Sequence, residues 1–261
     1  MNRFILVALI FCSCIAFGQR NKSIPLAEIE EQLMAAFNKI DYWYQHEDRF
    51  DSLERANAYF ERLLLKYTSS YPATLTHPFK KLDSAGVSIT TSEDGLFRIY
   101  SWNTLTGGSM RFYRVVFQYK GQNAIFSSPS KFDGHEPPDP GCFYYQINDV
   151  VSGKKTFYMA QAISILSSAL FYYAIDIFSI ERNNLNDKAK LIKTKSGIQN
   201  SLGYEIDLSA TANRTADIQN NYEIEYNKAT KTISIPLVQE DYKITDKRIR
   251  YRFTGKYFEK L

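Results

Sequence analysis

Leu170-Phe-Tyr-Tyr-Ala-Ile-Asp-Ile-Phe-Ser-Ile180 is the stretch that decides the fold, because it is apolar on both sides of an expected β-strand. Successive side chains of a strand point to opposite faces. A strand that is apolar on both faces is typical of the middle of a core, between two layers of structure. The residues of the two faces are Phe171, Tyr173 and Ile175, and Tyr172, Ala174 and Phe178.

The wider segment from Phe157 to Ile180 is also long and apolar enough to raise the alternative of a membrane span. Gln161 and Asp176 lie inside it, and a charged side chain near the centre of a bilayer costs a few kcal/mol. Two buried strands around a bend at Ser164–Ser168 fit the segment better.

Alternating, β-branched and aromatic runs separated by turn signals continue from Val87 to the end of the chain. They predict roughly a dozen short antiparallel strands, and no alternation of strands with helices supports a parallel sheet. The expected strands are Val87–Thr91, Leu96–Trp102, Met110–Tyr119, Ala124–Ser127, Phe143–Val150, Thr156–Ala162, Leu170–Arg182, Lys190–Thr194, Tyr204–Ala210, Tyr222–Tyr226, Thr232–Ile235, Tyr242–Thr245 and Ile249–Phe253.

Two amphipathic helices are expected before the strands, over residues 24–45 and from about Asp51 to Tyr67, because apolar residues recur there at spacings of three and four. Asp51 and Glu54 suit the first and last positions of a capping box. The two helices predict an antiparallel hairpin whose apolar faces pack on another layer. The expected fold class is mainly β, antiparallel, with an N-terminal helical hairpin (19–83) and a β domain (84–261) that is propeller-like or a sandwich, with blade-like sheets preferred.

The first eighteen residues resemble an export signal, with Arg3 in a basic start, an apolar run over 4–17, and small residues before an expected cleavage at Gln19. A retained membrane anchor and a lipid attached at Cys12 or Cys14 are the alternatives. Cleavage leaves Cys142 as the one cysteine, so no disulfide forms within the mature chain. The expected location is the periplasm or the outside of the cell.

The formal charge of the chain is +4, and loss of Arg3 with the leader lowers it to +3. Interspersed charges of both signs favour a soluble surface over one that binds nucleic acid or anionic lipid. The sequence lacks a Gly-x-Ser-x-Gly elbow, a His-Glu-x-x-His motif, a phosphate-binding glycine loop and a Cys-x-x-Cys motif. No cofactor, no metal and no membrane span in the mature chain is therefore predicted.

One acidic loop, Asp133–Cys142, brings three carboxylates, His135 and Cys142 together in sequence. Carboxylates and an imidazole can bind a divalent cation, and a Cys–His pair can form a nucleophile. The alternative is a rigid, solvated loop, because the segment also holds three prolines and two glycines.

A second candidate site consists of aromatic residues on the expected strands, with Tyr100, Trp102, Arg111 and His135 as the candidate ligand-binding residues. Aromatic faces exposed in a groove can stack on sugars or grip peptides. Rings that fill a β core explain the same pattern, and burial of Tyr100 and Trp102 would remove the binding hypothesis.

The third candidate is basic: Arg248, Arg250 and Arg252 alternate with apolar residues, with Lys243 and Lys247 just before them. This alternation predicts a half-buried strand with one wet face. Such a face could bind an anionic polymer, and a merely solvated surface accounts for the same residues.

The segment Thr91–Arg111 is similar to a stretch found in exported Gram-negative proteins of unknown function. Its turn Ser92-Glu93-Asp94-Gly95 also resembles the blade turn of propellers of the TolB or WD40-like kind. The resemblance implies an antiparallel hairpin at this turn, and it assigns no functional residue.

These observations predict an exported, non-enzymatic interaction or structural protein of the cell envelope, whose partner is a protein or glycan. The alternative is a glycan- or peptide-binding module that uses the aromatic strands. A hydrolase that uses the Asp133–Cys142 loop is a third hypothesis.

Overall fold

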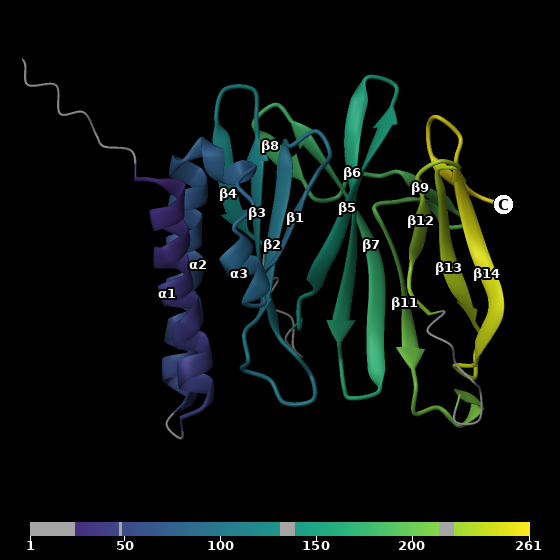
Figure 1. Ribbon diagram of the computed structural model, residues 1–261. Helices are drawn as coiled ribbons and strands as arrows, with labels where there is room; N and C mark the ends of the chain where they lie inside the picture. The colour runs from purple at the N-terminus through teal and green to yellow at the C-terminus, as the bar shows by residue number, and fades with distance from the viewer. Residues whose placement is uncertain (1–23, 47–48, 131–138, 214–221) are drawn as a thin grey trace, which may run out of the picture.

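The chain folds into four stacked layers, a helical pair followed by three β-sheets (Figure 1). The computed structural model describes residues 24–46, 49–130, 139–213 and 222–261. The predicted leader, residues 1–18, lies outside the described residues. The fold class is therefore the expected one, mainly antiparallel β with an N-terminal helical hairpin.

The helical layer begins with α1 (Leu26–Tyr44) and α2 (Arg49–Ser70), followed by the short η1 (Pro72–Leu75) and α3 (Lys80–Ser84). Both long helices are confirmed. Because α2 begins at Arg49, Asp51 lies inside its first turn, and the predicted N-cap role of Asp51 is wrong. The carboxylate of Glu54 instead pairs with Arg114 on the adjacent sheet, at 2.9 Å.

Three sheets follow the helical layer, and the strands of the second and third sheets are interleaved along the chain. The first sheet is β1 (Ser88–Thr91), β2 (Phe97–Asn103), β3 (Tyr113–Lys120) and β4 (Ile125–Pro129). The second contains β5 (Phe143–Ser152), β6 (Lys155–Ile165), β7 (Leu170–Glu181) and β11 (Ser201–Asp207), with β8 (Asn184–Asn186) on β7. The third contains β9 (Ile192–Thr194), β10 (Gly197–Gln199), β12 (Glu225–Asn227), β13 (Thr232–Val238), β14 (Ile244–Phe253) and β15 (Phe258–Lys260), and η2 (Thr211–Asn213) precedes β12.

The strands differ from the expectation in several details. β8, β10 and β15 lie outside the predicted strands, and β3 begins at Tyr113 and not at Met110. The segments Tyr242–Thr245 and Ile249–Phe253 join in the single strand β14. One pairing is parallel: β15 lies beside β9, with Phe258 opposite Ile192. A parallel pair needs a long connection, and the chain between β9 and β15 supplies it by building most of the third sheet.

Each interface between layers holds its own hydrophobic core. The first core joins the helices to β2 and β3 through side chains such as Phe60 and Trp102. The second joins the first and second sheets, with Phe97 and Phe178 in ring contact at 5.3 Å. The third joins the second and third sheets, where Ile177 and Phe258 are fully buried.

The strand β7 confirms the prediction made from its sequence. Ile175 and Ile177 face the core shared with the third sheet, whereas Phe178 faces the core shared with the first. The segment Phe157–Ile180 forms β6 and β7 around a bend. In the described ranges, no helix combines the length and the apolar character that crossing a membrane requires.

The turn Ser92–Gly95 joins β1 and β2 as an antiparallel hairpin and fastens it to the second sheet. The carboxylate of Asp149, on β5, accepts hydrogen bonds from the backbone N–H groups of Glu93 (3.0 Å) and Asp94 (2.9 Å). The hydroxyl of Tyr158 donates to Asp94 at 3.0 Å. Face-to-face packing of successive sheets is common to sandwiches and to propeller blades, so both predicted alternatives share this feature.

Candidate functional site

The outer side of the third sheet presents a row of arginines. β13 and β14 pair antiparallel, with Ser234 opposite Arg250 and Thr232 opposite Arg252. Tyr251 lies between the two arginines in sequence and packs in the third core. Because strand residues alternate between faces, Arg250 and Arg252 point away from that core. We call the outward residues Arg248, Arg250, Arg252, Thr232, Ser234 and Glu225 the arginine face.

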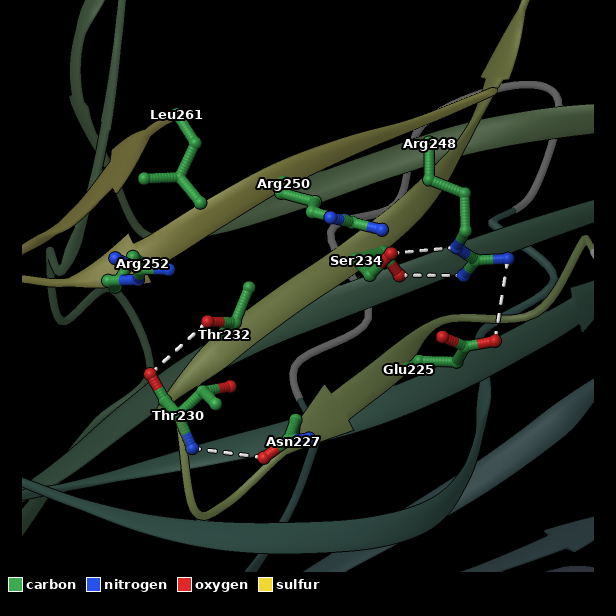
Figure 2. Close-up of a pocket in the computed structure, with 9 residues that line it drawn as sticks. All are labelled: Glu225, Asn227, Thr230, Thr232, Ser234, Arg248, Arg250, Arg252 and Leu261. Carbon is green, nitrogen blue, oxygen red and sulfur yellow. Dashed lines mark hydrogen bonds and ion pairs between the residues drawn. The ribbon is translucent and has the colours of Figure 1, made fainter. Parts of the chain in front are cut away.

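The arginine face borders a cavity of about 310 Å³ that is open to solvent. Residues of β12, β13 and β14 line it, together with Leu261. Figure 2 shows the three arginines following one another along β14, with Thr232 and Ser234 beside them on β13. The cavity is therefore polar, and guanidinium and hydroxyl groups border it.

Arg248 is held in place by its neighbours, and its side chain is only 9% exposed. Its Nε donates to Ser234 Oγ at 2.7 Å, and its Nη2 donates to the carbonyl oxygens of Ser234 (2.8 Å) and Glu223 (2.6 Å). Its Nη1 lies 3.6 Å from a carboxylate oxygen of Glu225. Arg248 therefore connects β12, β13 and β14 and fixes the shape of the cavity.

Arg250 and Arg252 are different, because both are exposed. Among the described residues, no acidic side chain forms an ion pair with either guanidinium. Adjacent same-face residues of a strand lie about 7 Å apart. The two side chains therefore form a pair of spaced, solvated cations.

Two glutamates on the same side of the sheet already have partners. Glu225 lies beside Arg248, and Glu259, which is opposite Arg252 in the strand register, pairs with Lys193 at 3.2 Å. The positive charges of Arg250 and Arg252 are thus left in excess on this side of the sheet. A guanidinium binds carboxylate or phosphate through two parallel hydrogen bonds, so the arrangement is suited to an anionic ligand.

The sequence indicated this surface only in part. The alternation in β14 predicts its wet face and the three arginines on it. The pattern did not show that Ser234 and Glu225 hold Arg248 while Arg250 and Arg252 have no acidic partner among the described residues, because those neighbours come from other strands. A cross-strand register is needed to see the difference.

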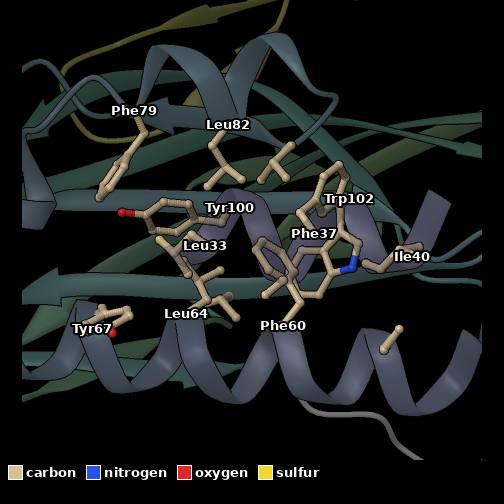
Figure 3. Close-up of a cluster of buried hydrophobic side chains, with 14 of the residues drawn as sticks. Leu33, Phe37, Ile40, Phe60, Leu64, Tyr67, Phe79, Leu82, Tyr100 and Trp102 are labelled. Carbon is tan, nitrogen blue, oxygen red and sulfur yellow. The ribbon is translucent and has the colours of Figure 1, made fainter. Parts of the chain in front are cut away.

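The predicted aromatic site is not exposed, because Tyr100 and Trp102 are both fully buried. The Trp102 ring packs edge-on against Phe60 at 4.9 Å, and its Nε1 donates to Asn57 at 3.0 Å. Figure 3 shows Tyr100 and Trp102 enclosed among helical side chains such as Leu33 and Phe37. The prediction that these rings line a groove is wrong: the helical layer covers that face of β2.

The other two candidate ligand-binding residues are Arg111 and His135. Arg111 is exposed in the loop before β3, where its backbone N–H donates to Ile165 at 2.9 Å. His135 falls outside the described residues. The structure therefore does not bring Tyr100, Trp102 and Arg111 together in one site.

Of the acidic loop, only residues 139–142 are described. Burial raises the pKa of Cys142 to about 12, so its thiol holds its proton at neutral pH and is a poor nucleophile. The carboxylate of Asp139 accepts a hydrogen bond from the N–H of Gly141 at 2.8 Å, which is a turn contact. No group of three or more metal-ligating side chains occurs within the ranges that the structure describes.

Comparison with known proteins leaves this site to be interpreted from its own geometry. No protein-family model matches the sequence, and no curated protein and no solved structure matches it at a significant level.

Proposed function

We propose that the protein is an exported, non-enzymatic interaction protein of the cell envelope that binds an anionic ligand through the arginine face. The observation that carries the proposal is the pair Arg250 and Arg252, exposed and without a described acidic partner beside a cavity of about 310 Å³. Binding of this kind needs positioned charges and no proton transfer.

Two features support binding over a merely solvated strand. Arg248 gives the cavity a fixed wall, because four of its contacts are to β12, β13 and the segment before β12. Thr232 and Ser234 add hydroxyl groups next to the free guanidinium groups. A preorganised wall lowers the cost of ordering the site when a ligand binds.

The test is a titration with soluble polyanions, namely polyglutamate, inorganic polyphosphate and a sulfated polysaccharide, followed by fluorescence anisotropy. We expect at least one to bind and to bind more weakly as the salt concentration rises. The double variant Arg250→Gln and Arg252→Gln should lose about fivefold to thirtyfold in affinity, because each of the two exposed ion pairs is worth about 0.5 to 1 kcal/mol.

The matched control is Arg55→Gln and Arg62→Gln, which removes two exposed arginines from α2 at the other end of the layer stack. It changes the net charge by the same amount and should leave the affinity unchanged. An equal loss in both double variants contradicts the proposal, as does a failure of both the polyanions and short acidic peptides to bind.

The proposed export is tested separately. The full-length chain, expressed in a Gram-negative host, should appear outside the cytoplasm with an intact mass that places its first residue at Gln19. A chain that stays in the cytoplasm with residues 1–18 attached contradicts export and leaves the binding proposal standing.

A further inference from the structure

We infer that the ligand of the arginine face is an acidic peptide segment in extended conformation, whose alternate carboxylates pair with Arg250 and Arg252. This inference rests on the proposed anionic ligand and names its chemical class. It follows from the spacing of the free cations, from the groups between them, and from the acidic residues on the same side of the sheet.

The spacing is the first argument. Arg250 and Arg252 are two residues apart on β14 and share one face, so their backbones lie about 7 Å apart along the strand. Alternate side chains of an extended peptide have the same spacing and also share one face. Each carboxylate of such a peptide can therefore meet one guanidinium in a bidentate pair, without bending either chain.

The hydroxyl groups are the second argument. Thr230 and Thr232 line the same cavity at the turn between β12 and β13, and Asn227 lies beside them. Hydroxyl and amide side chains both donate and accept hydrogen bonds. The Thr232 hydroxyl already donates to the carbonyl of Thr230 at 3.2 Å, and Asn227 Oδ1 accepts from the Thr230 N–H at 3.0 Å. The Thr230 hydroxyl and the amide NH2 of Asn227 therefore suit the N–H and C=O groups of a peptide backbone, which must find partners when they leave water.

The acidic residues give the third argument, which disfavours a dense polyanion. Glu225 borders the cavity, and Glu259 lies opposite Arg252 on β15. A polymer with a charge on every unit would bring negative groups close to both carboxylates, and like charges repel. Two discrete carboxylates paired with Arg250 and Arg252 bring fewer negative groups toward these glutamates than a dense polymer does. Recognition of acidic motifs by arginine clusters is an established mode of peptide binding.

The experiment compares two fluorescent heptapeptides of one composition, Thr-Thr-Glu-Thr-Glu-Thr-Thr and Thr-Thr-Glu-Glu-Thr-Thr-Thr. The first places both carboxylates on one side of an extended chain, and the second places them on opposite sides. We expect the alternating peptide to bind about fivefold more tightly, the gain of one exposed ion pair. Either Arg250→Gln or Arg252→Gln should abolish that preference, whereas the Arg55→Gln and Arg62→Gln control should keep it.

The outcomes separate the inference from the function on which it rests. Equal affinity for the two peptides overturns the inference. If inorganic polyphosphate binds and the peptides do not, and Arg250→Gln with Arg252→Gln removes that binding, the anionic ligand stands and the acidic peptide is overturned. If neither the peptides nor the polyanions bind, the inference and the proposed function are both contradicted.

Discussion

β2 and β14 both carry arginine on one face, but that face is buried in β2 and exposed in β14. In β2, Arg98, Tyr100 and Trp102 share one face, and the helical layer covers it so that all three are buried. In β14, Arg250 and Arg252 share a face that no described layer covers, and both are exposed. The layers stacked on a strand therefore decide whether its polar residues are buried structural groups or exposed ones.

The two sets of arginines show what burial demands. Arg98 is 4% exposed, and its guanidinium donates to the carbonyl oxygens of Thr74 (2.8 Å) and His77 (2.6 Å) and to Thr91 Oγ1 (2.7 Å). A buried charge without such partners would be costly. Arg250 and Arg252 remain hydrated, so the folded protein does not have to supply partners for their charges. A ligand can supply those partners.

The largest effect expected from this comparison is that of Trp102→Ala. The variant removes a fully buried ring that packs on Phe60 and leaves Asn57 without its indole donor. We expect the free energy of unfolding to fall by about 3 to 5 kcal/mol, as for other large aromatic truncations in cores. Urea denaturation measures the change. A loss below about 1 kcal/mol would mean that the helical layer does not cover this face of β2.

The next largest effect is that of Arg98→Met, which keeps the apolar stem and removes the guanidinium. The carbonyl group of His77 and Thr91 Oγ1 lose the donors that Arg98 supplies. The carbonyl group of Thr74 keeps only the longer contact from the Tyr100 hydroxyl, at 3.3 Å. Each unsatisfied buried group costs about 1 to 3 kcal/mol, so we expect a loss of about 2 to 3 kcal/mol in urea denaturation. Arg252→Met, the same substitution on the outer face, is the control and should change stability by less than about 0.5 kcal/mol. Equal losses in the two variants would contradict the comparison.

The contrast also shows how far the sequence could predict the structure. Hydrophobic periodicity located the helical hairpin and most strands, because period-2 and period-3.6 patterns are local. It left Trp102 undecided, because β2 carries apolar residues on both faces: Phe97 and Ile99 on one and Tyr100 and Trp102 on the other. Which face meets the helices depends on contacts with Phe60 and Asn57, far away in sequence.

The candidate site was likewise predicted only in part. The arginines of β14 were visible as an alternating set, and their exposed side was predicted. Arg248 is held by Ser234 and Glu225, whereas Arg250 and Arg252 have no acidic partner among the described residues. The sequence does not show this difference, because it depends on the register of three strands. The stacking order of the sheets was likewise outside the reach of local patterns.

A smaller effect is expected from Asp176, a carboxylate that faces inward on β7 beside a cavity of about 390 Å³. Burial raises the pKa of Asp176, although hydrogen bonds from Ser201 and Tyr144 oppose the shift. The folded protein therefore binds this proton more tightly than the unfolded chain does. Lowering the pH from neutral through the raised pKa should stabilise the protein, and the gain is complete below about pH 4, the usual range of an aspartate.

The variant Asp176→Asn isolates this contribution, because its amide does not titrate. The stability of the unchanged protein minus that of the variant should increase as the pH falls from 7 toward 4, measured by urea denaturation at each pH. A difference that stays flat or decreases over that range would show that Asp176 is not buried as the structure places it. It would also count against the comparison between buried polar groups, which need partners inside the protein, and exposed ones, which do not.

The smallest effect on stability is expected for Arg250→Gln combined with Arg252→Gln, and it is the most informative about the outer face. Neither guanidinium forms an ion pair with a described residue, so we expect the free energy of unfolding to change by less than about 0.5 kcal/mol. The two backbones lie about 7 Å apart along the strand, so the two charges repel each other weakly through water. Removing both charges therefore removes no stabilising contact between described residues. A loss above about 1 kcal/mol would assign both arginines a structural role like that of Arg98. An unchanged stability together with lost affinity for the alternating peptide would identify the outer face of β14 as a surface that serves binding and not folding.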